Sequence, residues 1–146
     1  MRVKSVLGRY IVGAILVATF ASPVQAGATA TTIELTSLSS GETFTTTGGL
    51  LCPAGTATTD FHRFGGSDRS RAGTFHLDKI MTCSDGSGTF TIRVDAATVF
   101  GSPTDQGGWS VLGGTGDYEG LKGGGNLVGT YVEDGIVDLY TGRVIL

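Results

Sequence analysis

Residues 75–96 read FHLDKIMTCSDGSGTFTIRVDA, and this stretch decides the fold. At its centre lies Asp85-Gly86. An Asp-Gly pair favours a tight β-turn, because both central positions of a type I′ turn need a positive φ. When the chain folds back at this pair, Met81 lies opposite Phe90 and apolar side chains fall on one side of the ribbon. The stretch is therefore predicted to form a β-hairpin.

The two faces of this hairpin differ in polarity, as expected for strands whose successive side chains alternate between faces. Lys79 is the one exception on the apolar side. It predicts either a bulge near Asp78–Lys79 or a polar cavity that receives the ammonium group. The apolar face carries Phe75, Leu77, Met81, Phe90, Ile92, Val94 and Ala96, and the polar face carries His76, Asp78, Arg93 and Asp95.

Short strands joined by tight turns are predicted for the remaining chain. Gly and Thr make up nearly a third of all residues, and both disfavour helices. A second hairpin is expected to turn at Asp134-Gly135, with Val132 opposite Val137 and both faces covered. The polar residues 60–72 are expected to form a loop or a short edge excursion. Seven or eight strands are counted, which is typical of an all-β sandwich or a closed barrel.

The first 26 residues have the pattern of a secretory signal peptide. Three basic residues precede an apolar run over Tyr10–Phe20, and Val24-Gln25-Ala26 offers small residues for cleavage before Gly27. The apolar run is too short for a membrane anchor, which needs about 20 residues. We therefore expect a secreted protein with a single domain over residues 27–146.

Removal of this leader would leave 7 basic and 13 acidic residues, a net charge of −6. Such a chain has no basic stripe to neutralise phosphates, so nucleic-acid binding is not expected. Stable association with anionic membranes after cleavage is not expected for the same reason.

The two cysteines, Cys52 and Cys83, are predicted to form a disulfide, because export places them in an oxidising compartment. A bridge between them would close a loop of about 32 residues and stabilise the fold by roughly 3.5–4 kcal/mol. A metal site is disfavoured, since neither cysteine lies in a CxxC motif and the two histidines are poorly spaced as ligands. Neither a metal nor a cofactor is expected.

Two further motifs have a chemical and a structural interpretation. His76, Asp78 and Arg93 cluster on the polar hairpin face and could act as general acid or base, but a solvated charge ladder is the favoured explanation, because surface ion pairs are common and weak. The segment Gly113–Gly123 lacks the Gly-Lys-Ser/Thr of a phosphate-binding loop. Its glycines instead predict a strained turn and a bulge beside Trp109.

The stretch from Trp109 to Gly123, the turn Cys52-Pro53-Ala54-Gly55-Thr56 and the segment Cys83–Phe90 resemble small secreted actinobacterial members of the allene oxide cyclase/dirigent-like superfamily. The resemblance covers most of residues 31–146. It implies an eight-stranded antiparallel barrel of the calycin or allene-oxide-cyclase type with an internal cavity. Plant relatives cyclise an epoxide or steer radical coupling, usually as trimers, so a homo-oligomer is also implied. None of the enzymes' catalytic positions can be matched to residues here.

Three functional hypotheses follow. The first is a barrel that binds a small, largely apolar molecule. The second is a cyclase or isomerase in which His76, Asp78 or Arg93 polarises a substrate held by the cavity. The third is a purely structural or interaction protein with a solid interior. The hairpin face that points inward distinguishes them. The candidate ligand-contacting residues are Phe75, Leu77, Phe90, Ile92, Val94 and Trp109.

Overall fold

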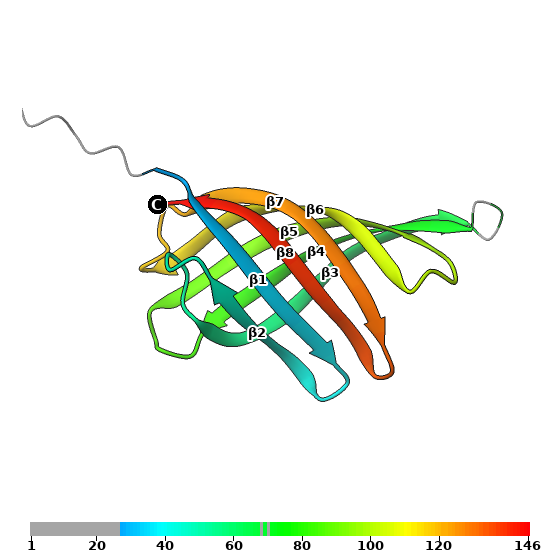
Figure 1. Ribbon diagram of the computed structural model, residues 1–146, viewed down its shortest axis with the longest axis horizontal. Helices are drawn as coiled ribbons and strands as arrows, with labels where there is room; N and C mark the ends of the chain where they lie inside the picture. The colour runs from blue at the N-terminus through cyan, green and yellow to red at the C-terminus, as the bar shows by residue number, and fades with distance from the viewer. Residues whose placement is uncertain (1–26, 68, 70) are drawn as a thin grey trace, which may run out of the picture.

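The computed structural model describes residues 27–67, 69 and 71–146, in which the chain forms an all-β, closed, eight-stranded barrel (Figure 1). Each strand pairs antiparallel with its neighbours in sequence, and β1 closes the barrel against β8. The predicted signal peptide, residues 1–26, lies outside the described residues. Within the described part there is no helix that could span a membrane. The strands are β1 (Thr29–Leu38), β2 (Gly41–Thr47), β3 (Ala54–Ser67), β4 (Ala72–Cys83), β5 (Gly88–Val99), β6 (Thr104–Gly116), β7 (Lys122–Val132) and β8 (Gly135–Ile145).

Strands β4 and β5 form the predicted hairpin in the predicted register, with Met81 opposite Phe90 and Leu77 opposite Val94. The apolar face points into the barrel, where Met81 and Phe90 are fully buried. No bulge separates the two strands at Lys79, which is itself buried inside the barrel. Of the two explanations for this lysine, the polar interior is therefore the correct one.

Of the two structures expected for residues 60–72, the loop is wrong, and the segment is closer to the edge excursion. Strand β3 continues to Ser67, and β4 begins at Ala72, so most of this segment is paired ribbon. Figure 1 shows the green ends of these two strands reaching beyond the neighbouring turns. Side chains on such a projecting ribbon meet water, which explains why the composition is that of a loop. A bulge at His62 also interrupts the alternation that would have revealed the strand.

The predicted register of the second hairpin is also wrong. The connection is Glu133-Asp134, and Gly135 already pairs with Val132, so that Thr130 lies opposite Val137. A Cβ at Gly135 would collide with the backbone of β1, so the glycine serves close strand packing instead of the turn. The outer face of this hairpin is not covered, since Val128, Val132 and Leu139 are all exposed.

The glycine-rich segment has the predicted structural role. A bulge lies where Val111 and Gly113 face consecutive residues of β5, which leaves Leu112 without a partner in that ladder. The connection from β6 to β7 then turns through Gly116 at φ 61° and Gly120 at φ 85°, a region that other residues rarely adopt.

The up-and-down topology gives the barrel two different ends. The connections β2–β3, β4–β5 and β6–β7 lie at one end, together with both ends of the described chain. This end, which we call the closed end, is filled by apolar side chains. Phe90 makes edge-to-face contacts with Phe44 and with Tyr118 from the β6–β7 connection. The open end carries the connections β1–β2, β3–β4, β5–β6 and β7–β8.

Candidate functional site

A cavity of about 250 Å³ occupies the open end of the barrel. Its walls come from six consecutive strands, β3 to β8. These segments converge because side chains at every second position point inward. Its apolar wall consists of Phe61, Phe75, Leu77, Val94, Ala96, Leu127 and Ile136, and its polar side chains are Lys79, Asp105, Tyr131, Asp138 and Tyr140.

Lys79 is only 4% exposed, and its charge is compensated inside the barrel. Its Nζ donates to Glu42 Oε1 at 2.7 Å, to Thr59 Oγ1 at 2.6 Å and to Ser37 Oγ at 3.2 Å. Burial alone would raise the pKa of Glu42, but the hydrogen bonds from Lys79, Thr59 and Ser37 outweigh this effect and lower the pKa. Glu42 is therefore ionised at neutral pH beside the buried Lys79.

Asp138 lies beside this ion pair and is only 6% exposed. The hydroxyl of Tyr140 donates to its Oδ2 at 3.1 Å. Burial raises the pKa of Asp138 to about 6, although the charge of Lys79 and the hydrogen bond from Tyr140 oppose the rise. Burial, reinforced by the charge of Asp138, raises the pKa of Tyr140 well above its ordinary value. Asp138 can therefore gain or lose a proton near neutral pH, whereas Tyr140 stays protonated.

Asp105 is the second buried carboxyl group of the cavity. The Tyr131 hydroxyl lies 3.3 Å from its Oδ2, whereas its buried Oδ1 has no hydrogen-bond partner among the described residues. Burial raises the pKa of Asp105, against the opposing effects of the Tyr131 hydroxyl and of the backbone N–H groups of Gly129 and Asp105. A Cβ at Gly129 would collide with Oδ1 of Asp105 and would lie 2.7 Å from Oδ1 of Asp138. The two carboxylates thus lie close together over a glycine of β7 that leaves them room.

The structure divides the six predicted ligand-contacting residues between the two ends. Phe75, Leu77 and Val94 line the cavity. Phe90 and Ile92 are fully buried in the closed-end core instead, and Trp109 is buried against Tyr140, its Nε1 3.3 Å from the Thr141 carbonyl oxygen. The sequence left open which hairpin face points inward, and the structure places the apolar face in the interior. Position along the strand then decides whether a residue of that face meets the cavity.

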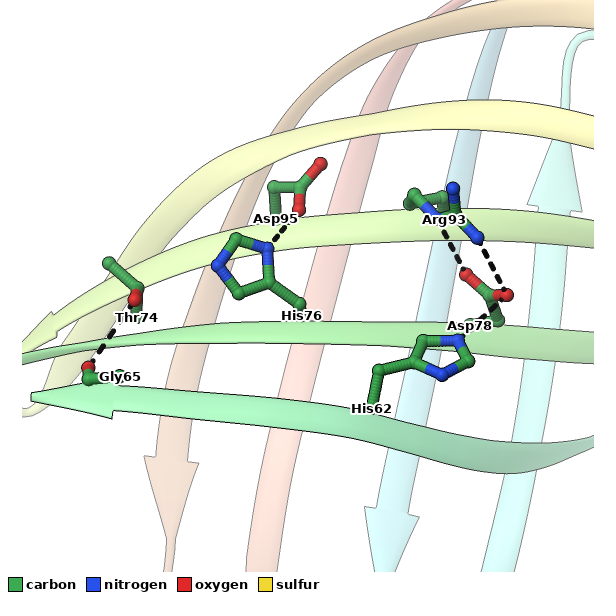
Figure 2. Close-up of polar contacts among 7 residues, drawn as sticks. All are labelled: His62, Gly65, Thr74, His76, Asp78, Arg93 and Asp95. Carbon is green, nitrogen blue, oxygen red and sulfur yellow. Dashed lines mark hydrogen bonds and ion pairs between the residues drawn. The ribbon is translucent and has the colours of Figure 1, made fainter.

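The three candidate acid/base residues lie on the outer surface of β4 and β5, away from the cavity (Figure 2). Asp78 accepts two hydrogen bonds from Arg93, at 3.0 and 3.2 Å, and lies 2.9 Å from His62 Nε2. The guanidinium of Arg93 holds the pKa of Asp78 below its ordinary value. His76 contacts Asp95 on the same face. The bulge in β3 directs His62 toward this cluster, a contact that sequence reasoning did not anticipate.

Cys52 and Cys83 form the predicted disulfide, which ties the β2–β3 connection to the end of β4. Asp85 lies near both sulfur atoms. Because both sulfurs are engaged in the bond, they are not available as thiolate ligands for a metal. The bridge belongs to the closed end and takes no part in the cavity.

Sequence reasoning missed most of the polar side chains of the cavity. Lys79 was recognised as anomalous, but its partner Glu42 could not be assigned to a face. Asp105 shares the phase of Trp109 along β6, and Asp138 shares the phase of Tyr140 and Val144 along β8. This alternation was the signal in the sequence that could have revealed them. A carboxylate an even number of residues from a buried aromatic side chain points to the same face of the strand, and so into the interior.

No protein-family model matches this sequence, and no curated protein or solved structure matches it either. The resemblance to the allene oxide cyclase/dirigent-like superfamily therefore stays a prediction. The geometry of the cavity has to carry the functional argument by itself.

Proposed function

We propose that this protein is a secreted binding barrel that holds a small, largely apolar molecule in the cavity at its open end. The observation that carries the proposal is an unfilled space of about 250 Å³, walled mainly by apolar side chains, beside a closed end that is densely packed. A barrel with a purely structural role has no reason to leave its interior open, because filling it would add dispersion contacts.

The size of the cavity limits the ligand. A cavity of about 150 Å³ holds benzene, and pockets for drug-sized molecules begin at about 300 Å³. The value of 250 Å³ lies between these limits. A molecule with one or two rings therefore fits, and four aromatic side chains, Phe61, Phe75, Tyr131 and Tyr140, are placed to contact it.

Secretion is part of the proposal. It is supported by the tripartite pattern of residues 1–26 and by the Cys52–Cys83 disulfide, because such bonds persist in oxidising compartments. Self-association, implied by the family resemblance, is a further prediction. It is supported by the exposed Val128 and Leu139, which lie opposite each other on β7 and β8.

Calorimetric titration with a neutral bicyclic probe, 1-naphthalenemethanol, tests the binding function. We expect saturable binding that weakens at least about tenfold in Ala96→Leu, because the larger side chain fills the cavity. Ala97→Leu is the matched control, since the neighbouring residue points outward. Ile136→Phe provides a second cavity-filling variant. Absence of binding, together with absence of any co-purified molecule in native mass spectrometry of the exported protein, would refute the proposal.

A cyclase or isomerase is the second candidate, and one observation favours it. Asp138 lies in the cavity with a pKa of about 6 and accepts a hydrogen bond from Tyr140, so that it could exchange a proton with a bound substrate at neutral pH. The test is whether a co-purified molecule changes chemically during incubation. In that case Asp138→Asn should stop the conversion.

A further inference from the structure

The cavity has no spare hydrogen-bond donor at its one lysine. An ammonium group carries three N–H donors. Lys79 directs them at Ser37, Glu42 and Thr59. An anionic ligand would therefore have to displace one of these partners to reach the only cationic side chain that the described part of the chain contributes to the cavity.

The hydroxyl groups of the two cavity tyrosines are also already engaged as hydrogen-bond donors. Tyr140 donates to Asp138 and Tyr131 donates to Asp105, so both point at carboxylates that already line the cavity. The acceptors exceed these donors, because Oδ1 of Asp105 is buried without a partner among the described residues. Such an orphaned acceptor is unfavourable unless a ligand or water supplies a donor.

Negatively charged side chains also outnumber positively charged ones around the cavity. Glu42 pairs with Lys79 at 2.7 Å, so Asp105 and Asp138 have no ion-pair partner of their own among the described residues, although the charge of Lys79 acts on Asp138 from nearby. Their Oδ1 atoms lie near each other on the inner side of Gly129. Among the described residues, two further polar groups face this pair. They are Thr98, which contacts the Tyr131 hydroxyl at 3.5 Å, and the backbone N–H of Gly129, which acts on Asp105. The described groups that face the two aspartates thus leave a negative site inside an aromatic wall.

From this juxtaposition we infer that the ligand is a small aryl-alkyl amine, bound as its ammonium ion. The ammonium group lies between Asp105 and Asp138 and donates to the free Oδ1 of Asp105, while the ring packs against Phe75, Tyr131 and Tyr140. Aromatic faces also attract cations directly, which adds to the affinity of such a site. The inference rests on the proposed binding function and specifies the ligand class for the same cavity.

Three probes with the same bicyclic ring and different charge test the inference. They are 1-naphthylmethylamine, 1-naphthalenemethanol and 1-naphthoate, titrated calorimetrically into the oxidised mature protein at pH 7.5. We expect the amine to bind at least about tenfold more tightly than the alcohol, and the carboxylate to bind most weakly. Equal affinity for amine and alcohol, or preference for the carboxylate, overturns the inference and leaves the binding function in place.

Two matched variants test whether the preference for the amine arises in the cavity. Asp105→Asn should reduce the affinity for the amine about tenfold and change the affinity for the alcohol less than about twofold. Asp95→Asn removes the same charge from the outer surface of β5 and should change neither affinity. An equal loss in both variants would mean that overall charge, and not the site, attracts the amine, which overturns the inference. If none of the three probes binds the wild-type protein, the inference fails, and the proposed function fails with it when native mass spectrometry also finds no co-purified molecule.

Discussion

The closed and open ends of the barrel are built from the same strands with the same alternation, yet their interiors differ. At the closed end Phe44, Phe90 and Tyr118 pack ring against ring beside the disulfide. At the open end Asp105 and Asp138 are buried around empty space. Buried carboxylates and empty volume both reduce stability. The comparison teaches that one end holds the fold together while the other is kept in a less stable arrangement suited to binding.

The largest expected difference between the two ends is the loss in the free energy of unfolding when a large aromatic side chain is truncated. Phe90→Ala should lower the free energy of unfolding by about 4 kcal/mol, because it opens a cavity in a packed core. Phe75→Ala should cost only about 1–2 kcal/mol, because that side chain already borders open space. Urea denaturation of both variants measures the difference. Equal losses would show that the two ends do not differ as described.

Removing the buried cation should also be costly. Lys79→Met strands the Glu42 carboxylate without its partner and should lower the free energy of unfolding by about 3 kcal/mol. The double variant Lys79→Met/Glu42→Leu removes both charges and should recover most of this loss. Urea denaturation at pH 7.5 is again the measurement. No recovery in the double variant would mean that packing by the lysine stem, and not the ion pair, matters.

Removing the negative charge of Asp138, which lies next to that ion pair, should increase the stability of the fold instead of lowering it. The pKa of Asp138 is about 6 in the fold against an ordinary value of 3.8, so the folded protein binds this proton more readily than the unfolded chain. The resulting stabilisation is complete below pH 4 and is lost as the pH rises through 6. Asp138→Asn should therefore stabilise the protein by about 2 kcal/mol at pH 7.5 and by almost nothing at pH 4. Thermal unfolding across this pH range checks the sign. A loss of stability at pH 7.5 would contradict the raised pKa.

The smallest effects are expected outside the barrel. His76→Gln and Arg93→Gln alter exposed ion pairs, which contribute little to stability. Both variants should leave the melting temperature and the affinity for 1-naphthalenemethanol unchanged within error. A clear loss of binding in either would move the functional site from the cavity to the outer face of β4 and β5.

Local patterns were sufficient to predict the barrel hairpin and the disulfide. The register of β4 and β5 follows from Asp85-Gly86 and an alternation with Lys79 as its one exception, and the pairing of Cys52 with Cys83 follows from there being no other cysteine in the sequence. The β7–β8 register was not predictable in the same way. Gly135 imitates a turn residue, while contact with β1, which is remote in sequence, determines its role.

The candidate site was only partly predictable for a related reason. Lys79 interrupts the apolar face, and this anomaly allowed a bulge or a polar interior, of which the structure shows the second. Its neighbours Glu42, Asp105 and Asp138 come from three other strands, and their convergence depends on how the barrel closes. The phase of each strand shows whether a side chain points inward, but not at which level of the barrel it lies. That level separates the cavity residues from the core residues.

The chain enters and leaves the barrel on adjacent strands, with Thr29 paired to Val144 at the end opposite the cavity mouth. Anything joined to the carboxyl end after Leu146 would therefore stand behind the barrel and leave the mouth unobstructed. Anchored to a sensor chip or fused to a reporter through that end, the molecule would present its opening to the surrounding fluid. Together with the proposed binding function, this geometry would suit a scaffold for capturing small compounds on a solid support.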